Sequence, residues 1–231
     1  MNNYRDPVEL ISQELLERAA KLGTAQLCDG MVDLGIYREG CLDASIMPVA
    51  CTMAMAGTAY TVETCDGDNF PIHMAIYQNK PGYVLMVDGK GYKDCAYVGD
   101  LLVGAARAVG ISGMVIDGLV RDKAGIIELG LPVFSRGFMQ RGPMKKGPGA
   151  INIPMICGGI KVNPGDLVVG DGDGVTVVPR DVITAVLEKA EKKGAYEIAR
   201  REVIEQYREC RTQNKPLPNL APDWVTKMLK K

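Results

Sequence analysis

The chain contains few aromatic residues and little histidine, and its positive and negative charges nearly balance. Only 6% of its 231 residues are aromatic, and His73 is the single histidine. We therefore expect a core of Val, Ile, Leu, Met and Ala, with tight turns at many of the 27 glycines. Because 27 Lys and Arg face 28 Asp and Glu, no basic surplus points to a nucleic-acid partner.

Long apolar runs and paired cysteine motifs are also missing. No run approaches the roughly 20 apolar residues that a membrane span needs, so we expect no membrane association. The seven cysteines are scattered and form no C-x-x-C pair, and no signal peptide precedes them. This pattern predicts reduced thiols in a cytoplasmic protein, and neither a disulfide framework nor a zinc cluster.

Helical and extended patterns alternate along the chain. Helices are expected at residues 7–22, 24–34, 123–130 and 181–211, a further helix follows Asp100, and a turn leads into another within 66–79. Several strand signals follow one another without a helix between them. That order favours a layered α/β sandwich with mixed sheets over a doubly wound sheet. We expect a single domain over residues 1–231, with residues 212–231 as a C-terminal tail.

Two strand signals share the same entry and exit turns. PGYVLMVDGKG spans residues 81–91 and PGDLVVGDGDG spans residues 164–174. Each has a Pro-Gly turn, an apolar run and a Gly/Asp-rich turn, which predicts two buried strands. The second ends on DGDG, which is either a turn or a fragment of a Ca²⁺ loop. A turn is favoured, because the other ligands of such a loop are absent.

The most informative stretch is residues 99–122, GDLLVGAARAVGISGMVIDGLVRD. Asp100 is placed to cap a helix whose first free amides, those of Leu101 and Leu102, suit an anion. Arg121 supplies a planar cation for a carboxylate or enolate oxygen, and Asp122 supplies a hard oxygen ligand for a metal. The alternative is a plain helix cap followed by a solvated turn.

This stretch also resembles a known family. The string is followed by LPVFSRG, by GPGAINIPMICGGIKVNPGDLVVGDGDGVTVVPR and by a Glu-bearing terminal helix. Together they are similar to RraA-like proteins, and within them to the class II 4-hydroxy-4-methyl-2-oxoglutarate / 4-carboxy-4-hydroxy-2-oxoadipate aldolases. The shared motif is an Asp, twenty residues, then Arg-Asp, here Asp100 and Arg121-Asp122. The resemblance implies a swivelling β/β/α sandwich in homotrimers or homohexamers, with sites between subunits.

The activity that the resemblance implies is retro-aldol cleavage of a 4-hydroxy-2-oxo acid to pyruvate and a second oxo acid. It implies Mg²⁺ or Mn²⁺ as the cofactor and oxaloacetate decarboxylation as a side reaction. Carried over by position, Asp122 is the direct metal ligand and Asp100 holds metal-bound water. The resemblance assigns Arg121 to the keto oxygen of a small 2-oxo acid.

The substrate carboxylate is assigned by the same resemblance to the backbone around Gly99, Leu101 and Leu102. Glu197 falls where the family has an acid that reaches the metal site of the neighbouring subunit, although other glutamates of the same helix have the same surface pattern. The chain departs from the family at Gly125, where an acid is frequent. Glu128, one helical turn on, is a partial substitute.

The chemistry is coherent, because a metal beside Arg121 stabilises charge on an enolate oxygen. The expected base is metal-bound water positioned by Asp100, since His73 lies in another helix and reads as a packed or capping residue. Asp117 reads as a turn residue or a supporting group. The cations Arg141, Lys145 and Lys146 steer anions or only add surface charge. Two other functions stay open: a protein-binding regulator of ribonuclease E type, and another 2-oxo-acid lyase.

Overall fold

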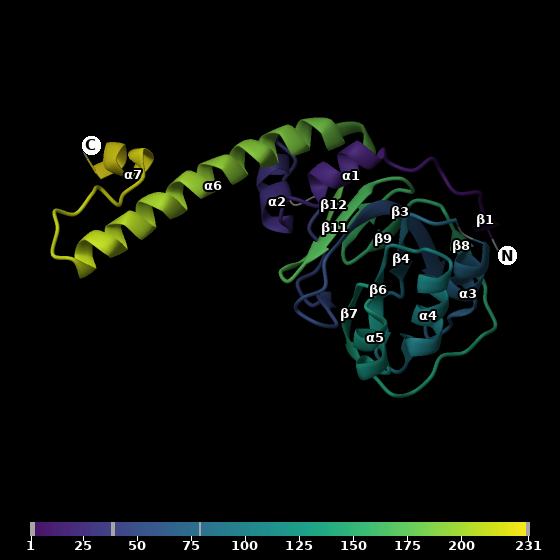
Figure 1. The fold of residues 1–231 in the computed structure, drawn as a ribbon. Helices are drawn as coiled ribbons and strands as arrows, with labels where there is room; N and C mark the ends of the chain where they lie inside the picture. Colours follow the sequence, from purple (N-terminus) through teal and green to yellow (C-terminus); the bar gives the residue numbers. More distant parts are fainter. Residues whose placement is uncertain (1–2, 38–39, 79, 230–231) are drawn as a thin grey trace. The chain divides into compact units, whose positions relative to one another are not determined.

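The computed structural model describes residues 3–37, 40–78 and 80–229. Its helices are α1 (Gln13–Ala19), α2 (Thr24–Val32), α3 (Phe70–Gln78), α4 (Asp100–Ala108), α5 (Lys123–Leu129), α6 (Ile183–Thr212) and α7 (Asp223–Leu229), with a 3₁₀ turn at Arg180–Val182. Asn79, the last residue of one expected helix, lies outside the described residues. The fold is the predicted mixed α/β sandwich (Figure 1).

The strands begin and end as follows: β1 (Asn3–Tyr4), β2 (Met47–Pro48), β3 (Met55–Thr64), β4 (Tyr83–Asp88), β5 (Ala96–Val98), β6 (Gly113–Val120), β7 (Val133–Phe138), β8 (Gly149–Ile151), β9 (Met155–Cys157), β10 (Ile160–Val162), β11 (Leu167–Asp171) and β12 (Gly174–Val178). The two strands with shared turns are β4 and β11. Each is entered through a glycine in the left-handed region, Gly82 at φ 95° and Gly165 at φ 92°, which a residue with a side chain rarely adopts.

The sheet has a parallel centre with antiparallel flanks. Among the described residues, ten strands join one sheet whose main path is β1-β8-β3-β4-β6-β7-β2. Strands β3, β4, β6 and β7 run parallel, and β5 adds to β6 in the same direction. Strand β11 pairs antiparallel with β3 and β12. Because β5 and β6 are parallel neighbours, their carboxyl ends lie at the same edge of the sheet.

Each face of this sheet is covered. On one face, α3, α4 and α5 bury apolar side chains such as Ile72, Val103 and Ile126 against the parallel strands. On the other face, the β9–β10 hairpin and the β11–β12 pair enclose a second core that includes Phe134 and Met86. Full burial of one such side chain contributes about 1.5–3 kcal/mol. The layers are therefore helices, sheet and strands, as the β/β/α description requires.

A third core lies where α1, α2 and the start of α6 pack on β11 and β12. The DGDG segment makes the turn between these strands, as predicted, and Asp171 holds the start of α2. Its Oδ2 accepts from the Thr24 amide at 2.8 Å and its Oδ1 accepts from the Thr24 hydroxyl at 2.8 Å.

The expectation that all cysteines are reduced is wrong at one place. Cys28 of α2 and Cys41 are joined by a disulfide, while the other five cysteines are free. Packing on β12 brings the pair together. The backbone of Cys41 forms an isolated antiparallel β-bridge with Thr176 of β12, and the Thr176 hydroxyl lies 3.2 Å from the Cys28 sulfur. A sequence separation of 13 carries no sign of this tertiary contact.

Two helix predictions also need correction. The first helix is shorter than residues 7–22, because the segment before it makes tertiary hydrogen bonds instead. The Ile11 amide donates to the Thr58 hydroxyl at 3.0 Å, and the Glu9 backbone carbonyl accepts from Arg180 Nη1 at 2.7 Å. The tail contains helix α7, which was not expected. Pro222 and Asp223 at its start are typical of a helix N-terminus.

The chain divides into two compact units, Met1–Ala190 and Glu191–Lys231, and the division falls inside α6. The first unit holds the sheet and helices α1 to α5. The second holds the rest of α6 and α7. Within the described residues, no helix has both the length and the apolar character that crossing a bilayer requires.

Candidate functional site

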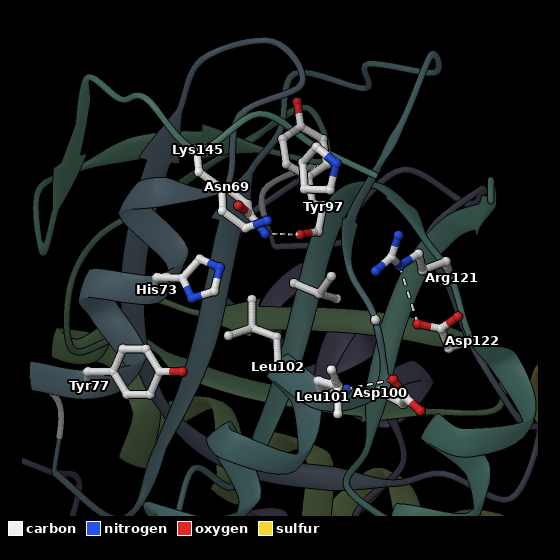
Figure 2. A pocket seen from close by; sticks show the side chains of 13 residues that line it. Asn69, His73, Tyr77, Tyr97, Asp100, Leu101, Leu102, Arg121, Asp122 and Lys145 are labelled. Carbon is white, nitrogen blue, oxygen red and sulfur yellow. Dashed lines mark hydrogen bonds and ion pairs between the residues drawn. The ribbon is translucent and has the colours of Figure 1, made fainter. Parts of the chain in front are cut away.

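A pocket of about 290 Å³ lies in the first unit, at the edge where β5 and β6 end (Figure 2). It is lined by Asn69, His73, Tyr77, Tyr97, Val98, Gly99, Asp100, Leu101, Leu102, Arg121, Asp122, Pro143 and Lys145. Five of the predicted site residues come from residues 99–102 and 121, and the predicted metal ligand Asp122 joins them. The structure thus brings together every predicted site residue of the first unit.

Helix α4 starts at this pocket, one residue earlier than predicted. Gly99 is the N-cap, and Asp100 is the first helical residue instead of the cap. Asp100 folds back on its neighbour, because its Oδ1 accepts from the Leu101 amide at 2.7 Å. The Leu102 amide lies in the first turn, where a helix has no acceptor for it. The positive end of the helix at Leu102 therefore suits a carboxylate.

Arg121 and Asp122 follow β6 directly. The Arg121 amide donates to the Val98 carbonyl at 3.0 Å, which fixes the end of β6 beside the end of β5. Asp122 has a left-handed backbone, φ 59° and ψ 45°, just before α5. Such a conformation costs a non-glycine residue about 1 kcal/mol or more and is concentrated at functional sites. Here it turns the carboxylate back toward Arg121, whose Nε lies 3.3 Å from Asp122 Oδ2.

Three glycines leave the space that the charged groups occupy. A Cβ on Gly99 would overlap the Asp122 carboxylate, and one on Gly125 would lie 2.8 Å from Asp100 Cβ. A Cβ on Gly142 would lie 3.0 Å from Arg121 Nη1. The glycine at 125, where the family frequently has an acid, is therefore matched to the position of Asp100. Glu128, its expected substitute, is exposed on α5 and is not among the residues that line the pocket.

The opposite wall comes from α3 and from the loop after β7. His73 lines this wall with Tyr77, and their ring centroids are 6.0 Å apart. Burial lowers the pKa of His73, and the nearby Lys145 ammonium lowers it further. The imidazole is therefore neutral near pH 7 and can accept a hydrogen bond. Figure 2 shows His73 and Tyr77 across the pocket from Arg121 and Asp122.

The interpretation of His73 as a packed or capping residue stays a prediction, and the structure adds that its side chain lines the pocket. A signal was present in the sequence. Asn69, directly before α3, and His73 and Tyr77 within it recur every four residues, which places them on one face. Nothing in the sequence shows which way that face points.

Asn69 gives this wall an unused acceptor. Its Nδ2 donates to the Tyr97 carbonyl at 2.8 Å, and its buried Oδ1 has no hydrogen-bond partner among the described residues. An unpaired buried acceptor is costly, and it is relieved when a ligand donates to it. The Tyr97 ring is itself fully buried.

Other singled-out residues lie elsewhere. Asp117 is buried away from the pocket, where it accepts from Arg136 Nε at 2.5 Å and from the Gly158 amide at 2.6 Å. That network ties β6, β7 and the β9–β10 hairpin together. Of the three cations considered for steering, Lys145 lines the pocket, whereas Arg141 and Lys146 do not.

Glu197 lies on α6 in the second unit, where its Oε2 is 3.9 Å from Arg201 Nη2. Its contact with a neighbouring subunit stays a prediction. In the described part of the chain, no three His, Cys, Asp or Glu side chains gather closely enough to enclose a metal by themselves.

The fold and pocket define an α/β protein with a helix N-terminus beside a cation and two acids. The chain belongs to the RraA-like family, since the family model "RraA-like: Aldolase/RraA" matches residues 24–177. A relative from Halalkalibacterium halodurans, provisionally named 4-hydroxy-4-methyl-2-oxoglutarate aldolase, is 42% identical over 163 residues, 71% of this chain and 78% of its own.

Solved structures agree with this assignment. RraAS2 of Streptomyces coelicolor, described as an unusual member of the RNase ES inhibitor RraA protein family, superposes with a TM-score of 0.73 at 26% identity, over 83% of this chain and 98% of its own. An uncharacterized protein from Pseudomonas syringae pv. tomato reaches 0.72 at 30% identity, over 90% of this chain and 97% of its own.

Proposed function

We propose that this protein is a divalent-metal-dependent carbon–carbon lyase that cleaves a 4-hydroxy-2-oxo acid to pyruvate and a second oxo acid. Oxaloacetate decarboxylation is its expected side activity, because both reactions leave the same pyruvate enolate. The observation that carries the proposal is the convergence of Asp100, Arg121 and Asp122 on one pocket at the N-terminus of α4. The provisional name of the Halalkalibacterium halodurans relative supports the same reaction.

The residues present fit a hard divalent cation. Asp122 and Asp100 offer carboxylate oxygens, and Gly99 and Gly125 leave the space those groups need. We propose Asp122 as the direct ligand and Asp100 as the acceptor for a water in the metal's shell, with Mg²⁺ or Mn²⁺ as the ion. When bound, the metal supplies Lewis acidity that stabilises negative charge on the substrate's keto oxygen.

The chain's own groups then divide the remaining work. The Leu102 amide and the positive end of α4 hold the substrate carboxylate, and Leu101 and Gly99 shape the same turn. The Arg121 guanidinium donates to the keto oxygen and stabilises the charge that develops there as the bond breaks. The Asp100 carboxylate would orient the base that takes the hydroxyl proton, so that a base acts at the hydroxyl end of the breaking bond and Arg121 at the keto end.

The opposite wall of the pocket, which we call the far wall and which includes Asn69, His73, Tyr77 and Lys145, is suited to the fragment of the substrate that departs. Lys145 provides a positive charge for a second carboxylate, and neutral His73 accepts a hydrogen bond from a hydroxyl. The unused Oδ1 of Asn69 can accept another. A substrate with one carboxylate at each end would therefore meet a cationic or positive group at both ends of the pocket.

We further propose a cytoplasmic homotrimer or homohexamer in which Glu197 reaches the pocket of a neighbouring subunit. This assembly rests on the resemblance of the chain to its family. Light scattering of the purified protein tests it, and loss of activity in Glu197→Gln with an unchanged assembly tests the role of the acid.

The test of the reaction is a coupled assay for pyruvate release from 4-hydroxy-4-methyl-2-oxoglutarate and from oxaloacetate. We expect turnover of both with Mg²⁺, and none from Asp122→Asn. The similarity to RraAS2 favours a second candidate, a protein-binding regulator of ribonuclease E type. That candidate gains if no 2-oxo acid is turned over and the protein instead slows RNA cleavage by ribonuclease E.

A further inference from the structure

Asp68 lies outside the pocket but bonds to both parts of its far wall. Its side chain is buried, at 2% exposure, directly before α3. Oδ1 accepts from the Phe70 amide at 2.8 Å, at the first residue of α3. Oδ2 accepts from the Lys146 amide at 2.6 Å, in the loop that carries Lys145. One carboxylate thus joins the helix that presents His73 to the loop that presents Lys145.

The surrounding backbone makes this connection specific. Asp68 and Met144 form a short parallel bridge, in which the Asn69 amide donates to Met144 O at 3.0 Å and the Met144 amide donates to Gly67 O at 2.7 Å. The loop otherwise contains three glycines and two prolines within residues 142–149 and has little regular structure. Its position beside α3 therefore depends on these few bonds.

We propose that Asp68 is a positioning residue that sets the far wall of the pocket. It fixes the position of Lys145 relative to His73, and it affects the substrate only through these two residues. Its catalytic consequence rests on the proposed function, in which Lys145 takes the second carboxylate of the substrate. Since Arg121 and Asp100 are held by other elements, loss of Asp68 should weaken substrate binding more than bond cleavage.

The natural test is Asp68→Asn, which keeps the shape of the side chain. An amide has a single acceptor oxygen, so it can hold only one of the two backbone amides and faces the other with its own N–H groups. Asp68→Ala removes both bonds. Hydrogen exchange of the purified protein then reports the loop and the start of α3 directly, without any substrate.

Asp166 is a matched control. It is also 2% exposed, and its carboxylate also accepts from two backbone amides, those of Asn163 at 2.7 Å and Arg180 at 3.1 Å. It lines no part of the pocket. Asp166→Asn should therefore lower the melting temperature as Asp68→Asn does, while leaving KM and exchange of the loop unchanged.

For Asp68→Asn, we expect faster hydrogen exchange either in the loop or at the start of α3, and for Asp68→Ala we expect it in both. For Asp68→Asn, we also expect KM for oxaloacetate to rise about tenfold while kcat stays within about threefold of the wild type. In a Lys145→Met background, Asp68→Asn should add little, because both changes remove the same interaction. Unchanged exchange in Asp68→Ala, fully additive KM effects, or an equal KM effect from Asp166→Asn would overturn the proposal. If the wild-type protein turns over no 2-oxo acid, the proposed function fails, and exchange alone decides the positioning role.

Discussion

Gly99 faces Asp122 so closely that a Cβ on Gly99 would overlap the Asp122 carboxylate. The two residues belong to different turns, one before α4 and one before α5. The backbone of Gly99 is extended, with φ −132°, so the glycine is needed there for space and not for its dihedral angles. The carboxylate that we assign to the metal thus owes its position to a missing methyl group.

Gly99→Ala should therefore disable the site without disturbing the fold. The new methyl group displaces the Asp122 carboxylate, and we expect metal-dependent turnover to fall at least about a hundredfold, the scale of losing one catalytic contact. A steady-state assay with oxaloacetate measures this. The far-ultraviolet circular dichroism spectrum should remain that of the wild type.

Gly104→Ala, inside the helix that Gly99 caps, is the matched control. A Cβ there meets only the side chain of Leu129 at 3.8 Å, an ordinary contact. Alanine is favoured over glycine inside a helix by about 0.5–1 kcal/mol, so the unfolding midpoint should rise and activity should be retained. Equal losses of activity in both alanine variants would contradict a specific role of Gly99 in leaving space for the Asp122 carboxylate.

Arg121→Lys should be a poor replacement although it keeps the charge. The guanidinium is planar and presents several N–H groups at once, whereas an ammonium group is a point charge on a flexible stem. We expect kcat to fall by about a hundredfold with the protein still folded. Rates near those of the wild type would mean that Arg121 does not contact the developing charge.

Gly125→Glu would introduce the acid that the family frequently has at this position. In this chain the Cβ would lie 2.8 Å from Asp100 Cβ and 2.9 Å from Asp100 Oδ2. We predict weaker metal activation, by about tenfold or more, since the substitution displaces Asp100 before its own carboxylate can help. Titration of activity with Mn²⁺ checks this, and stronger activation would contradict it.

His73 should make the folded protein less stable in acid. Its folded-state pKa is below the ordinary 6.5, because burial and Lys145 disfavour the charged imidazole. The unfolded chain therefore binds the proton first, and stability is lost as the pH falls from about 6.5 through the folded pKa. His73→Gln should remove this part of the pH dependence. Urea unfolding at pH 7 and pH 5 measures the difference, which a partner-stabilised, charged His73 would reverse in sign.

The wall of the pocket formed by Asp100, Arg121 and Asp122 could be predicted because it follows from strand order. Strands β5 and β6 flank α4 and run parallel, so the residue after β5 and the residues after β6 meet at one edge. Gly99 directly follows β5, with Asp100 next to it, and Arg121 and Asp122 follow β6. The turn at residues 171–174 was predictable for a similar local reason, its dense Gly and Asp content.

The far wall could not be predicted, because it depends on contacts that leave no periodic pattern. Lys145 stands in a glycine- and proline-rich loop whose place is set by hydrogen bonds to Gly67, Asp68 and Asn69. The Cys28–Cys41 disulfide likewise depends on the packing of α2 against β12. Both features depend on tertiary contacts, which composition and residue spacing do not reveal.

The most direct test of the account is the rate of oxaloacetate decarboxylation before EDTA, after EDTA and after return of Mg²⁺, for the wild type and for Asp122→Asn. We expect EDTA to abolish turnover in the wild type, Mg²⁺ to restore it, and the variant to stay inactive throughout. Turnover that is indifferent to EDTA, or equal in the two proteins, would contradict the claim that these residues hold a metal beside a pyruvate-like anion.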